Sequence, residues 1–318
     1  MIDHSRRNPL VIVVGPTAVG KTETSINIAK ALDGEIVSAD SMQVYKFMDI
    51  GSAKPSLEER QGIPHYLMDE IDPRSHFSVA EFQEKALQHI DDIVSRHKLP
   101  IIVGGTGLYV NSIIYNLDFS GTFSNWAFRN QLEEEAKEFG NNYLHDKLKQ
   151  IDHELASRIH PNNIKKIIRA LEVFEESGDI MKDFQDSMVE NTKFDYVLIG
   201  LIRNRQELYN RINSRVDLLI ERGLVNEVKG LVELGLDDQD ISMKGLGYKE
   251  IIKYLKGEYT LEEAMEILKR DTRRYAKRQI TWFKRYEKIK WFDFNEYTTI
   301  NGLEKDIIQY IEGYFHFL

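Results

Sequence analysis

The sequence predicts an α/β fold, in which helices flank a parallel β-sheet and an all-helical subdomain is inserted into the sheet domain. Three observations predict this fold. Short apolar, β-rich runs alternate with helical patterns along most of the chain, which is typical of a parallel sheet. A glycine-rich turn joins the first of these runs directly to a helix. The alternation then lapses between residues 117 and 195, where the patterns are helical only.

The N-terminal part of the chain alternates between predicted strands and predicted helices. Each strand is an apolar run, and one helix begins with a Ser-x-x-Glu capping box at Ser78 and Glu81. In chain order we expect a strand at Val11–Val14, a helix at Lys21–Leu32, a strand at Glu35–Ser38, a helix from Ser78 to about His97, a strand at Leu99–Val103 and a helix at Thr106–Tyr115.

The middle of the chain is expected to be the helical insertion. A turn-rich segment opens it, and helical patterns follow, the last of which ends at Gly178. The predicted helices are Trp126–Phe139, Asn142–Gln150 and Asn163–Ser177. We therefore assign residues 1–118 and 196–318 to the sheet domain and residues 119–195 to the insertion.

The C-terminal part returns to the sheet domain and is then mostly helical. The run Tyr196–Leu201 predicts a further strand, and "KIKWFDF" around Trp291 predicts the last one. Between them, Asn204 and Thr260 are start signals for helices, because a glutamate follows each of them three residues later.

Composition narrows the class of protein. The chain has 318 residues, of which 42% are hydrophobic and 29% charged, as in an ordinary soluble protein. It contains no cysteine, which excludes disulfides, thiolate metal sites and a cysteine nucleophile. The N-terminal segment has only about five apolar residues before the glycine-rich turn, too few for a signal peptide or a membrane span. We expect a cytoplasmic monomer that does not contact a membrane.

Charge is segregated along the chain. The formal net charge is −9, but residues 269–290 hold ten Lys or Arg against two acidic residues, a local +8, so that the rest carries −17 by difference. The cations fall at helical spacing, and a cationic stripe of this kind suits a nucleic-acid backbone. A solvated helix face is the alternative. The opposing apolar seam consists of Leu268, Tyr275 and Trp282.

The glycine-rich turn, "GPTAVGKT", has the pattern of a phosphate-binding loop (P-loop). It fits G-x-x-x-x-G-K-[ST] in full, follows a strand and opens a helix, which is the context that the motif requires. Gly15 and Gly20 let the backbone wrap an anion, Lys21 supplies positive charge and Thr22 can bind Mg²⁺. The residues expected to bind a diphosphate, or a nucleotide such as ATP, are Gly15, Pro16, Thr17, Ala18, Val19, Gly20, Lys21 and Thr22.

The sequence lacks some of the motifs that a nucleotide-hydrolysing enzyme needs. Such enzymes hold their metal with an acidic residue at the end of a second apolar strand. Here the strand that ends at Val103 runs into Gly104, Gly105 and Thr106, and no carboxylate follows it. The guanine-binding Asn-Lys-x-Asp pattern is missing as well.

A second polar segment, "SADSMQVY", follows the predicted strand Glu35–Ser38. In a parallel sheet its first residues would lie beside the P-loop. Asp40 is then a metal-holding carboxylate, a general base or a cap of the turn. Gln43 adds an amide that can both donate and accept hydrogen bonds.

With these segments side by side, the chain resembles the tRNA dimethylallyltransferase family of the bacterial type, also called isopentenylpyrophosphate:tRNA transferases. Nine motifs in the family's order carry the resemblance, which spans nearly the whole length. They are "GPTAVGKT", "SADSMQVY", "IGSAKP", "HYLMD", "FSVAEF", "PIIVGGTGLYV", "RIHPNN" with "RALEV", "GLGYKE" and "AKRQITWF". Three positions depart from the usual pattern: Ser52 replaces Thr, Asn163 replaces Asp and Lys166 replaces Arg, which loses bidentate geometry.

The resemblance implies transfer of a dimethylallyl group from its diphosphate to N6 of adenosine 37, beside the anticodon, in tRNAs that read codons beginning with U. The P-loop would then hold a pyrophosphate leaving group with Mg²⁺ as the cofactor, and Asp40 would accept the proton of N6. Arg211 and Arg215 are spaced i and i+4, and one of them is expected to close over the diphosphate, with a solvated helix face as the alternative. The residues expected to be catalytic are Asp40, Lys21, Thr106, Arg211 and Arg215.

The resemblance also implies how the anticodon stem-loop is bound. The basic helix, "SADSMQ" and the insertion around His160–Lys166 would contact it, and we interpret His160 itself as a turn residue. The residues expected to contact tRNA are Asp40, Ser41, Met42, Gln43, Thr106, Lys166, Arg274, Lys277 and Arg278.

Two other functions stay open. A small-molecule or nucleotide kinase would use the P-loop and let Asp40 activate a hydroxyl group, but it leaves the basic helix without a role. A non-catalytic RNA-binding protein with a regulatory nucleotide would use the basic helix, but it leaves "SADSMQVY" without one.

Overall fold

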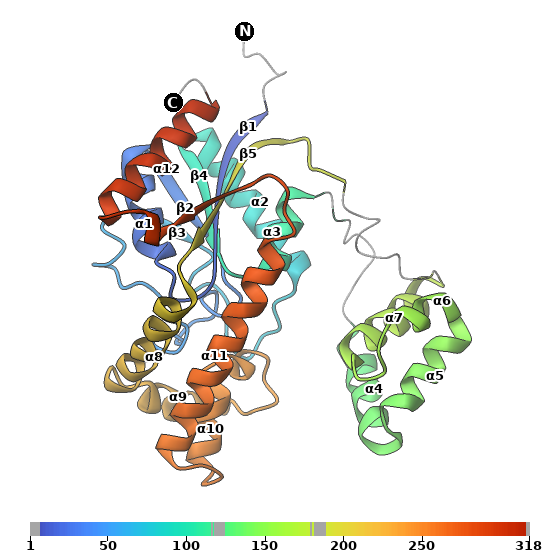
Figure 1. Ribbon diagram of the computed structural model, residues 1–318. Helices are drawn as coiled ribbons and strands as arrows, with labels where there is room; N and C mark the ends of the chain where they lie inside the picture. The colour runs from blue at the N-terminus through green and yellow to red at the C-terminus, as the bar shows by residue number, and fades with distance from the viewer. Residues whose placement is uncertain (1–6, 116, 118–124, 179, 181–188, 316–318) are drawn as a thin grey trace. The chain divides into compact units, whose positions relative to one another are not determined.

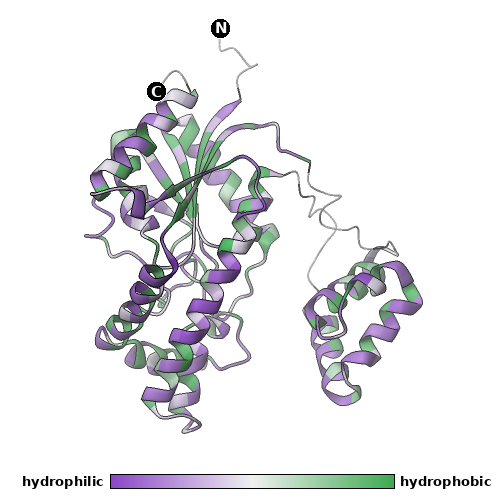
Figure 2. Ribbon diagram, in the orientation of Figure 1, coloured by the Kyte–Doolittle hydropathy of each residue, from purple (hydrophilic) through white to green (hydrophobic). Residues whose placement is uncertain are grey.

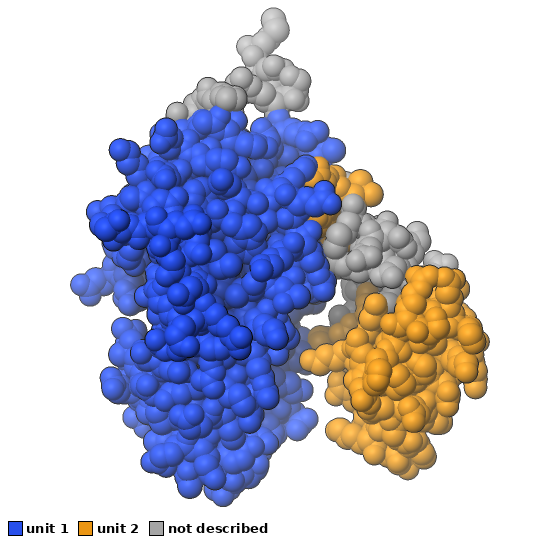
Figure 3. All heavy atoms as spheres, in the orientation of Figure 1, with its two compact units in different colours: residues 1–114, 191–318 blue, residues 115–190 orange. Residues whose placement is uncertain are grey.

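The chain forms two compact units, which Figure 3 shows in different colours: residues 1–114 with 191–318, and residues 115–190. The computed structural model describes residues 7–115, 117, 125–178, 180 and 189–315. The first unit contains the β-sheet, and the second is mostly helical. The predicted fold class, a parallel sheet flanked by helices with a helical insertion, is confirmed.

The sheet is parallel throughout, with strand order β3-β2-β4-β1-β5-β6 (Figure 1). Its inner strands are apolar on both faces, as expected for a sheet that helices cover on both sides (Figure 2). The strands are β1 (Asn8–Val14), β2 (Gly34–Ala39), β3 (His65–Tyr66), β4 (Leu99–Gly104), β5 (Phe194–Ile202) and β6 (Ile289–Asp293).

Helices of the first unit cover both faces of the sheet and extend beyond the carboxyl ends of the strands (Figure 1). On one face, Val11 and Val13 of β1 belong to one hydrophobic core with Ile26 of α1 and Ile307 of α12. Helices α2 and α3 lie on the other face. These four are α1 (Lys21–Ala31), α2 (Val79–Ser95), α3 (Gly107–Ile114) and α12 (Ile300–Phe315). The helices beyond the strand ends are α8 (Arg205–Glu221), α9 (Leu224–Glu233), α10 (Tyr248–Leu255) and α11 (Leu261–Phe283), and the short 3₁₀ turns are η1 (Ser242–Lys244) and η2 (Phe294–Glu296).

The second unit has a hydrophobic core of its own, to which α4 to α7 contribute residues such as Leu132 and Leu148. Glu172 is buried beside this core, where its carboxylate binds Arg129 and Arg169 and accepts a hydrogen bond from the amide of Asn125. A buried charge is stable only when it is paired in this way. The helices are α4 (Trp126–Phe139), α5 (Asn141–Ile151), α6 (His153–Arg158) and α7 (Ile164–Ser177).

Most predicted elements are present, with ends shifted by a few residues. The capping boxes at Ser78 and Thr260 and the left-handed Gly178 after α7 are all observed. The second predicted domain boundary, between residues 195 and 196, is wrong: β5 begins at Phe194, because Asn8 to Leu10 of β1 pair with residues 194–196. The boundary predicted at residues 118 and 119 lies outside the described residues. The short elements β3 and α6 were not predicted.

Among the helices that the structure describes, none combines the length and the apolar character that crossing a lipid bilayer requires.

Candidate phosphate-binding and proton-transfer site

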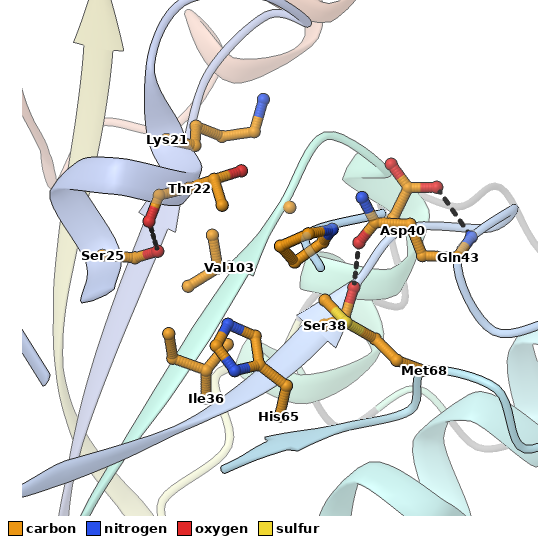
Figure 4. Close-up of a pocket in the computed structure, with 12 residues that line it drawn as sticks. Lys21, Thr22, Ser25, Ile36, Ser38, Asp40, Gln43, His65, Met68 and Val103 are labelled. Carbon is orange, nitrogen blue, oxygen red and sulfur yellow. Dashed lines mark hydrogen bonds between the residues drawn. The ribbon is translucent and has the colours of Figure 1, made fainter. Parts of the chain in front are cut away.

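The site lies where three neighbouring strands of the sheet end. Since β2, β4 and β1 are adjacent and parallel, the loops that follow them meet at one edge. These loops are the P-loop after β1, the segment from Asp40 after β2 and the segment Gly105–Thr106 after β4. Two pockets open there and share Lys21, Thr22, Asp40 and Gln43, and Figure 4 shows the smaller of them.

Polar side chains bind the P-loop backbone at nearly every residue. Lys21 Nζ donates to the carbonyl oxygens of Gly15 (2.9 Å) and Pro16 (2.8 Å). Arg211 Nε donates to Ala18 O (2.9 Å), and Arg203 Nε donates to Val19 O (2.8 Å). These cations hold the carbonyl groups of the loop in place, and Lys21 and Arg211 also line the pocket beside it, so that positive charge faces any anion the loop binds.

Gly20, the residue before α1, has a backbone conformation that favours glycine. Its φ is 118°, and a Cβ atom there would lie 3.0 Å from the ring of Phe294. The guanidinium of Arg203 stacks on that same ring, 3.7 Å from its centroid. Phe294 and Arg203 thus pack closely against the turn that leads into α1. The N-terminus of the helix, whose first N–H groups have no partner within the helix, faces the pocket.

Lys21 has an unusual protonation equilibrium. Burial lowers the pKa of Lys21 to about 7, against the opposing effect of the Asp40 carboxylate, and the positive charge of Arg215 lowers it further. A diphosphate in the pocket would add negative charge and favour the ammonium form. Lys21 is therefore a cation whose charge depends on what the pocket holds.

Asp40 caps the turn that follows β2. Its Oδ1 atom accepts hydrogen bonds from the amides of Met42 (2.8 Å) and Gln43 (3.3 Å). Among the described residues, no hydrogen bond involves Oδ2. The cap interpretation is confirmed, and the second carboxylate oxygen is free for another role, which stays a prediction.

Thr106 connects two of the three loops. Its Oγ1 atom accepts a hydrogen bond from Ser41 N (3.2 Å), and its own amide donates to Ala39 O (3.2 Å). The hydroxyl of Tyr275 on α11 in turn interacts with Thr106. Tyr275, which was expected in an apolar seam, instead lines the pocket that contains Asp40.

Arg211 and Arg215 both line that pocket, opposite the P-loop. Arg211 binds the P-loop carbonyl of Ala18 and is otherwise exposed. Arg215 is more deeply placed, and burial lowers its pKa, with the Asp40 carboxylate opposing the shift. Both arginines therefore face one pocket, and the closing of one of them over a diphosphate stays a prediction.

The smaller pocket combines polar and apolar walls (Figure 4). Ile36, Met68 and Val103 line it together with Lys21 and Asp40. His65 also lines it, and burial lowers the pKa of its ring, whose Nδ1 lies 2.8 Å from Ile63 O. A neutral imidazole and apolar side chains next to Lys21 allow one ligand to be apolar at one end and anionic at the other.

A carboxylate beneath the site fixes the "IGSAKP" loop. Glu227 of α9 accepts hydrogen bonds from three successive amides, those of Asp49 (2.9 Å), Ile50 (2.6 Å) and Gly51 (3.0 Å). Tyr248, which is fully buried, donates its hydroxyl proton to Glu227 (2.9 Å). The next residues of this loop face the amide of Gln43, so Glu227 and Tyr248 support the site from a distance.

We expect Tyr248→Phe to lower the free energy of unfolding by about 1–3 kcal/mol, because it leaves polar partners unsatisfied in a buried place. The tyrosine hydroxyl also accepts a hydrogen bond from Ser52 N (3.1 Å), which phenylalanine cannot replace. Urea unfolding measures the change. Tyr254→Phe on the same helix is the matched control, since the described structure records no hydrogen bond from its hydroxyl, and an equal loss in both variants would contradict the assignment.

The residues expected to contact tRNA fall into three groups. Asp40, Ser41, Met42, Gln43 and Thr106 lie together at the pocket. Arg274, Lys277 and Arg278 are exposed on α11. Lys166 lies on α7, in the second unit, after a turn in which Asn162 N donates to His160 Nδ1, which confirms His160 as a turn residue.

The cations of the basic segment, residues 269–290, do not all face solvent without a partner. Lys269 forms an ion pair with Asp217 of α8 (2.7 Å), and Arg273 donates to Asn213 of the same helix (2.6 Å). These two cations attach α11 to α8. Arg270 and Arg274 both pair with Asp271 of α11 itself, and Lys277 and Arg278 are exposed.

Sequence reasoning missed four residues of the site: Arg203, Glu227, Tyr248 and Gln279. Gln279 binds both the P-loop and the loop after β4. A signal for it existed, because an amide stands among cations at the spacing of the buried positions Ala276 and Phe283. Glu227 gave no local signal, since nothing near it in sequence distinguishes it from a surface glutamate.

Fold and site together define a P-loop protein in which a carboxylate and two arginines line a pocket with the loop. A family model described as IPP transferase matches residues 43–286. The chain belongs to this family.

Known relatives resemble the chain over nearly its full length. The tRNA dimethylallyltransferase of Alkaliphilus oremlandii is 58% identical over 309 residues, which are 97% of this chain and 99% of that protein. That of Clostridioides difficile is 53% identical, covering 96% and 98%. The crystal structure of the full-length tRNA isopentenylpyrophosphate transferase from Bacillus halodurans is 44% identical, with a TM-score of 0.73 and 97% coverage of both chains.

A more distant solved structure is a eukaryotic dimethylallyltransferase acting on tRNA. It is 29% identical, with a TM-score of 0.80, and the alignment covers 94% of this chain and 78% of that one.

Proposed function

We propose that this protein transfers a dimethylallyl group from dimethylallyl diphosphate to N6 of adenosine 37 in tRNAs that read codons beginning with U. The observation that carries the proposal is the placement of Asp40 in one pocket with Lys21, Arg211 and Arg215. The names of the close relatives support it. We further propose that the protein acts in the cytoplasm as a monomer.

The reaction breaks the bond between C1 of the dimethylallyl group and the diphosphate oxygen, which keeps the electron pair. The lone pair of N6 forms the new C–N bond, and N6 loses a proton. Pyrophosphate therefore gains negative charge while the allylic carbon skeleton carries positive charge. The amides of the P-loop, Lys21 and the two arginines stabilise the departing anion, which is the largest electrostatic demand of the step.

Asp40 receives the N6 proton. The exocyclic amine of adenine is a poor nucleophile because its lone pair is delocalised into the ring, so that removing its proton as the bond forms lowers the barrier. Oδ2 takes that proton while Oδ1 stays bound to the amides of Met42 and Gln43. One carboxylate thus both shapes the loop and serves as the base.

The donor set suits Mg²⁺, which prefers oxygen ligands and takes only one or two from a protein when phosphates supply others. Thr22 and Asp40 line the same pocket, and the described residues contain no cluster of three acidic or histidine side chains that would form an all-protein cage. Thr22 would hold the ion with diphosphate oxygens, and the ion would neutralise part of the charge on the leaving group.

The anticodon stem-loop binds along α11, through Arg274, Lys277 and Arg278, and through Lys166 of the insertion. Adenosine 37 is stacked in the anticodon loop, so it has to be extruded before its N6 can reach Asp40. Ser41, Met42, Gln43 and Thr106 then contact the extruded base and its neighbours.

We expect Arg274→Gln, Lys277→Gln and Arg278→Gln each to weaken RNA binding severalfold and to reduce the slope of log K against log salt concentration by about 0.7–0.9. Each variant removes one exposed cation that can bind a phosphate. Fluorescence anisotropy with a labelled anticodon stem-loop over a salt series measures both quantities.

Lys269→Gln is the matched control on the same helix, since Lys269 pairs with Asp217 and is largely covered. Its salt slope should equal that of the unmodified protein. Three unchanged slopes in the test variants would place the RNA elsewhere.

A paired assay tests the function. One anticodon stem-loop with adenosine 37 is incubated with the protein and either dimethylallyl diphosphate or ATP, with Mg²⁺ in both, and the RNA mass is then measured. A prenyl-sized gain with the diphosphate only supports the proposal. No gain there, with consumption of ATP in the other tube, would make the chain a kinase, and binding without any reaction would make it an RNA-binding protein.

A further inference from the structure

Gln279 of α11 connects the two loops that flank the phosphate pocket. Its neighbours Lys277 and Arg278 are exposed, but Gln279 itself is only 5% exposed. Its Oε1 atom accepts a hydrogen bond from Thr17 N of the P-loop (2.9 Å), and its Nε2 atom donates one to Gly105 O after β4 (3.0 Å). One side chain therefore bridges these two loops just beyond the point where β1 and β4 stop pairing.

The local structure is built around this bridge. A Cβ atom on Gly105 would lie 2.1 Å from Gln279 Nε2, so only glycine lets the amide approach this closely. One turn before Gln279, the hydroxyl of Tyr275 interacts with both Thr106 and Gln279. Since Thr106 also binds Ser41 N next to Asp40, the inner face of α11 is connected to the third loop of the site through Thr106.

The outer face of the same turns carries the cations. Arg274, Lys277 and Arg278 are exposed there, within five positions of Gln279. A helix is stiff over this length, so a force on its cations from an RNA backbone also acts on the side chains of its inner face.

We propose that Gln279 is a positioning residue that couples RNA binding on α11 to diphosphate binding in the P-loop. The proposal rests on the proposed function for the identity of the two ligands. RNA on the outer face favours the arrangement in which Gln279 bridges Thr17 and Gly105, and this arrangement is the one in which the P-loop binds an anion. By linkage, each ligand then tightens the binding of the other by the same factor.

The experiment uses the full chain, inorganic pyrophosphate with Mg²⁺ as the probe and an anticodon stem-loop as the RNA. Calorimetry gives the dissociation constant of pyrophosphate with and without saturating RNA. We expect RNA to tighten it about fivefold or more in the unmodified protein. In Gln279→Met, which keeps the volume but removes both hydrogen bonds, the factor should fall to about one, while affinity for RNA alone stays within about threefold.

Two further variants sharpen the test. Gly105→Ala removes the same bridge from its other end, since the added methyl group displaces the amide, and it should abolish the coupling in the same way. Thr281→Val is the control on α11, because the one hydrogen bond that the Thr281 hydroxyl makes among the described residues is to the helix carbonyl of Lys277, and it should leave the coupling factor unchanged. In steady-state assays at saturating RNA, Gln279→Met should raise KM for the diphosphate more than it lowers kcat.

The outcomes separate this proposal from the function. A coupling factor of one in the unmodified protein, or full coupling in both Gln279→Met and Gly105→Ala, would overturn the role of Gln279 even if prenyl transfer occurs. Absence of prenyl transfer by the unmodified protein would overturn the function, and the binding measurement does not depend on turnover.

Discussion

Asp40→Asn is expected to lower kcat for prenyl transfer by about 10²–10⁴-fold, the usual contribution of a positioned general base. The asparagine carbonyl oxygen can still accept the hydrogen bonds that Met42 and Gln43 donate to Oδ1. Its amide nitrogen replaces Oδ2 and cannot take a proton. The substitution therefore separates the two roles of Asp40, and affinity for the anticodon stem-loop should change by less than about threefold.

Asp40→Ala provides the comparison, because it removes the cap as well as the base. It should show the same loss of kcat and, in addition, a loss of about 1 kcal/mol in unfolding free energy, as for other lost caps. Single-turnover kinetics, RNA binding and urea unfolding measure these three quantities.

Asp91→Asn is the control for the change of charge, since Asp91 is an exposed residue of α2 whose carboxylate binds Lys193. If Asp40→Asn keeps kcat within tenfold of the unmodified protein, Asp40 is not the base. If RNA binding collapses in both Asp40 variants, the residue is structural only.

For Asp40, the position could be predicted from the sequence, but the role could not. Its position beside the P-loop followed from a local pattern, a short apolar strand in a parallel sheet, and Asp40 does share a pocket with Lys21 and Thr22. The choice between cap and base did not follow, because both roles use the same carboxylate. Only the geometry shows that the turn uses one oxygen, while no hydrogen bond of the described residues involves the other.

Residues that act across long sequence distances were not predictable. Gln279 and Thr17 are 262 positions apart, and Glu227 and Gly51 are 176 apart. Their roles depend on how the sheet brings the loops together, which no local pattern encodes. Tyr275 was misassigned for the same reason, since helical spacing predicts a buried face but not whether a pocket opens along it.

The fold was easier to predict than the site because it rests on repeated local signals. Apolar runs, the capping boxes at Ser78 and Thr260 and the glycine after α7 each specify a short stretch independently of the rest. The misplaced boundary at β5 is instructive, since Phe194 and Asp195 join that strand only through pairing with Asn8 and Pro9 of β1. Such pairing is a tertiary effect.

Lys21→Met is expected to lower kcat by about 10²–10³-fold, as does the loss of other groups that stabilise developing negative charge. Lys30→Met, which changes an exposed lysine at the other end of α1, is the matched control and should have little effect on kcat.

We also expect pyrophosphate binding to depend on pH because of Lys21. Its pKa in the folded protein is about 7, so it is charged below pH 7 and becomes neutral as the pH rises above 7.

Pyrophosphate favours the charged form, and binding above pH 7 must therefore take up a proton. The ratio of pyrophosphate affinities, unmodified protein over Lys21→Met, should be constant at low pH and should fall by up to about tenfold per pH unit above 7. Taking the ratio cancels the titration of pyrophosphate itself. A ratio that stays constant from pH 6 to pH 9 would show that Lys21 does not titrate in this range.

The free energy of unfolding should rise with pH above 7, whereas the contribution of Lys21 to pyrophosphate affinity should fall. The ordinary value for lysine is 10.5, so between pH 7 and pH 10.5 the unfolded chain binds more protons at Lys21 than the folded protein does. Stability then rises with pH through this window, and the cost of burying the ammonium group is greatest below pH 7. Lys21→Met should consequently stabilise the protein more at pH 6 than at pH 9, as measured by urea unfolding. The same burial that weakens the fold thus keeps Lys21 responsive to the charge of the ligand.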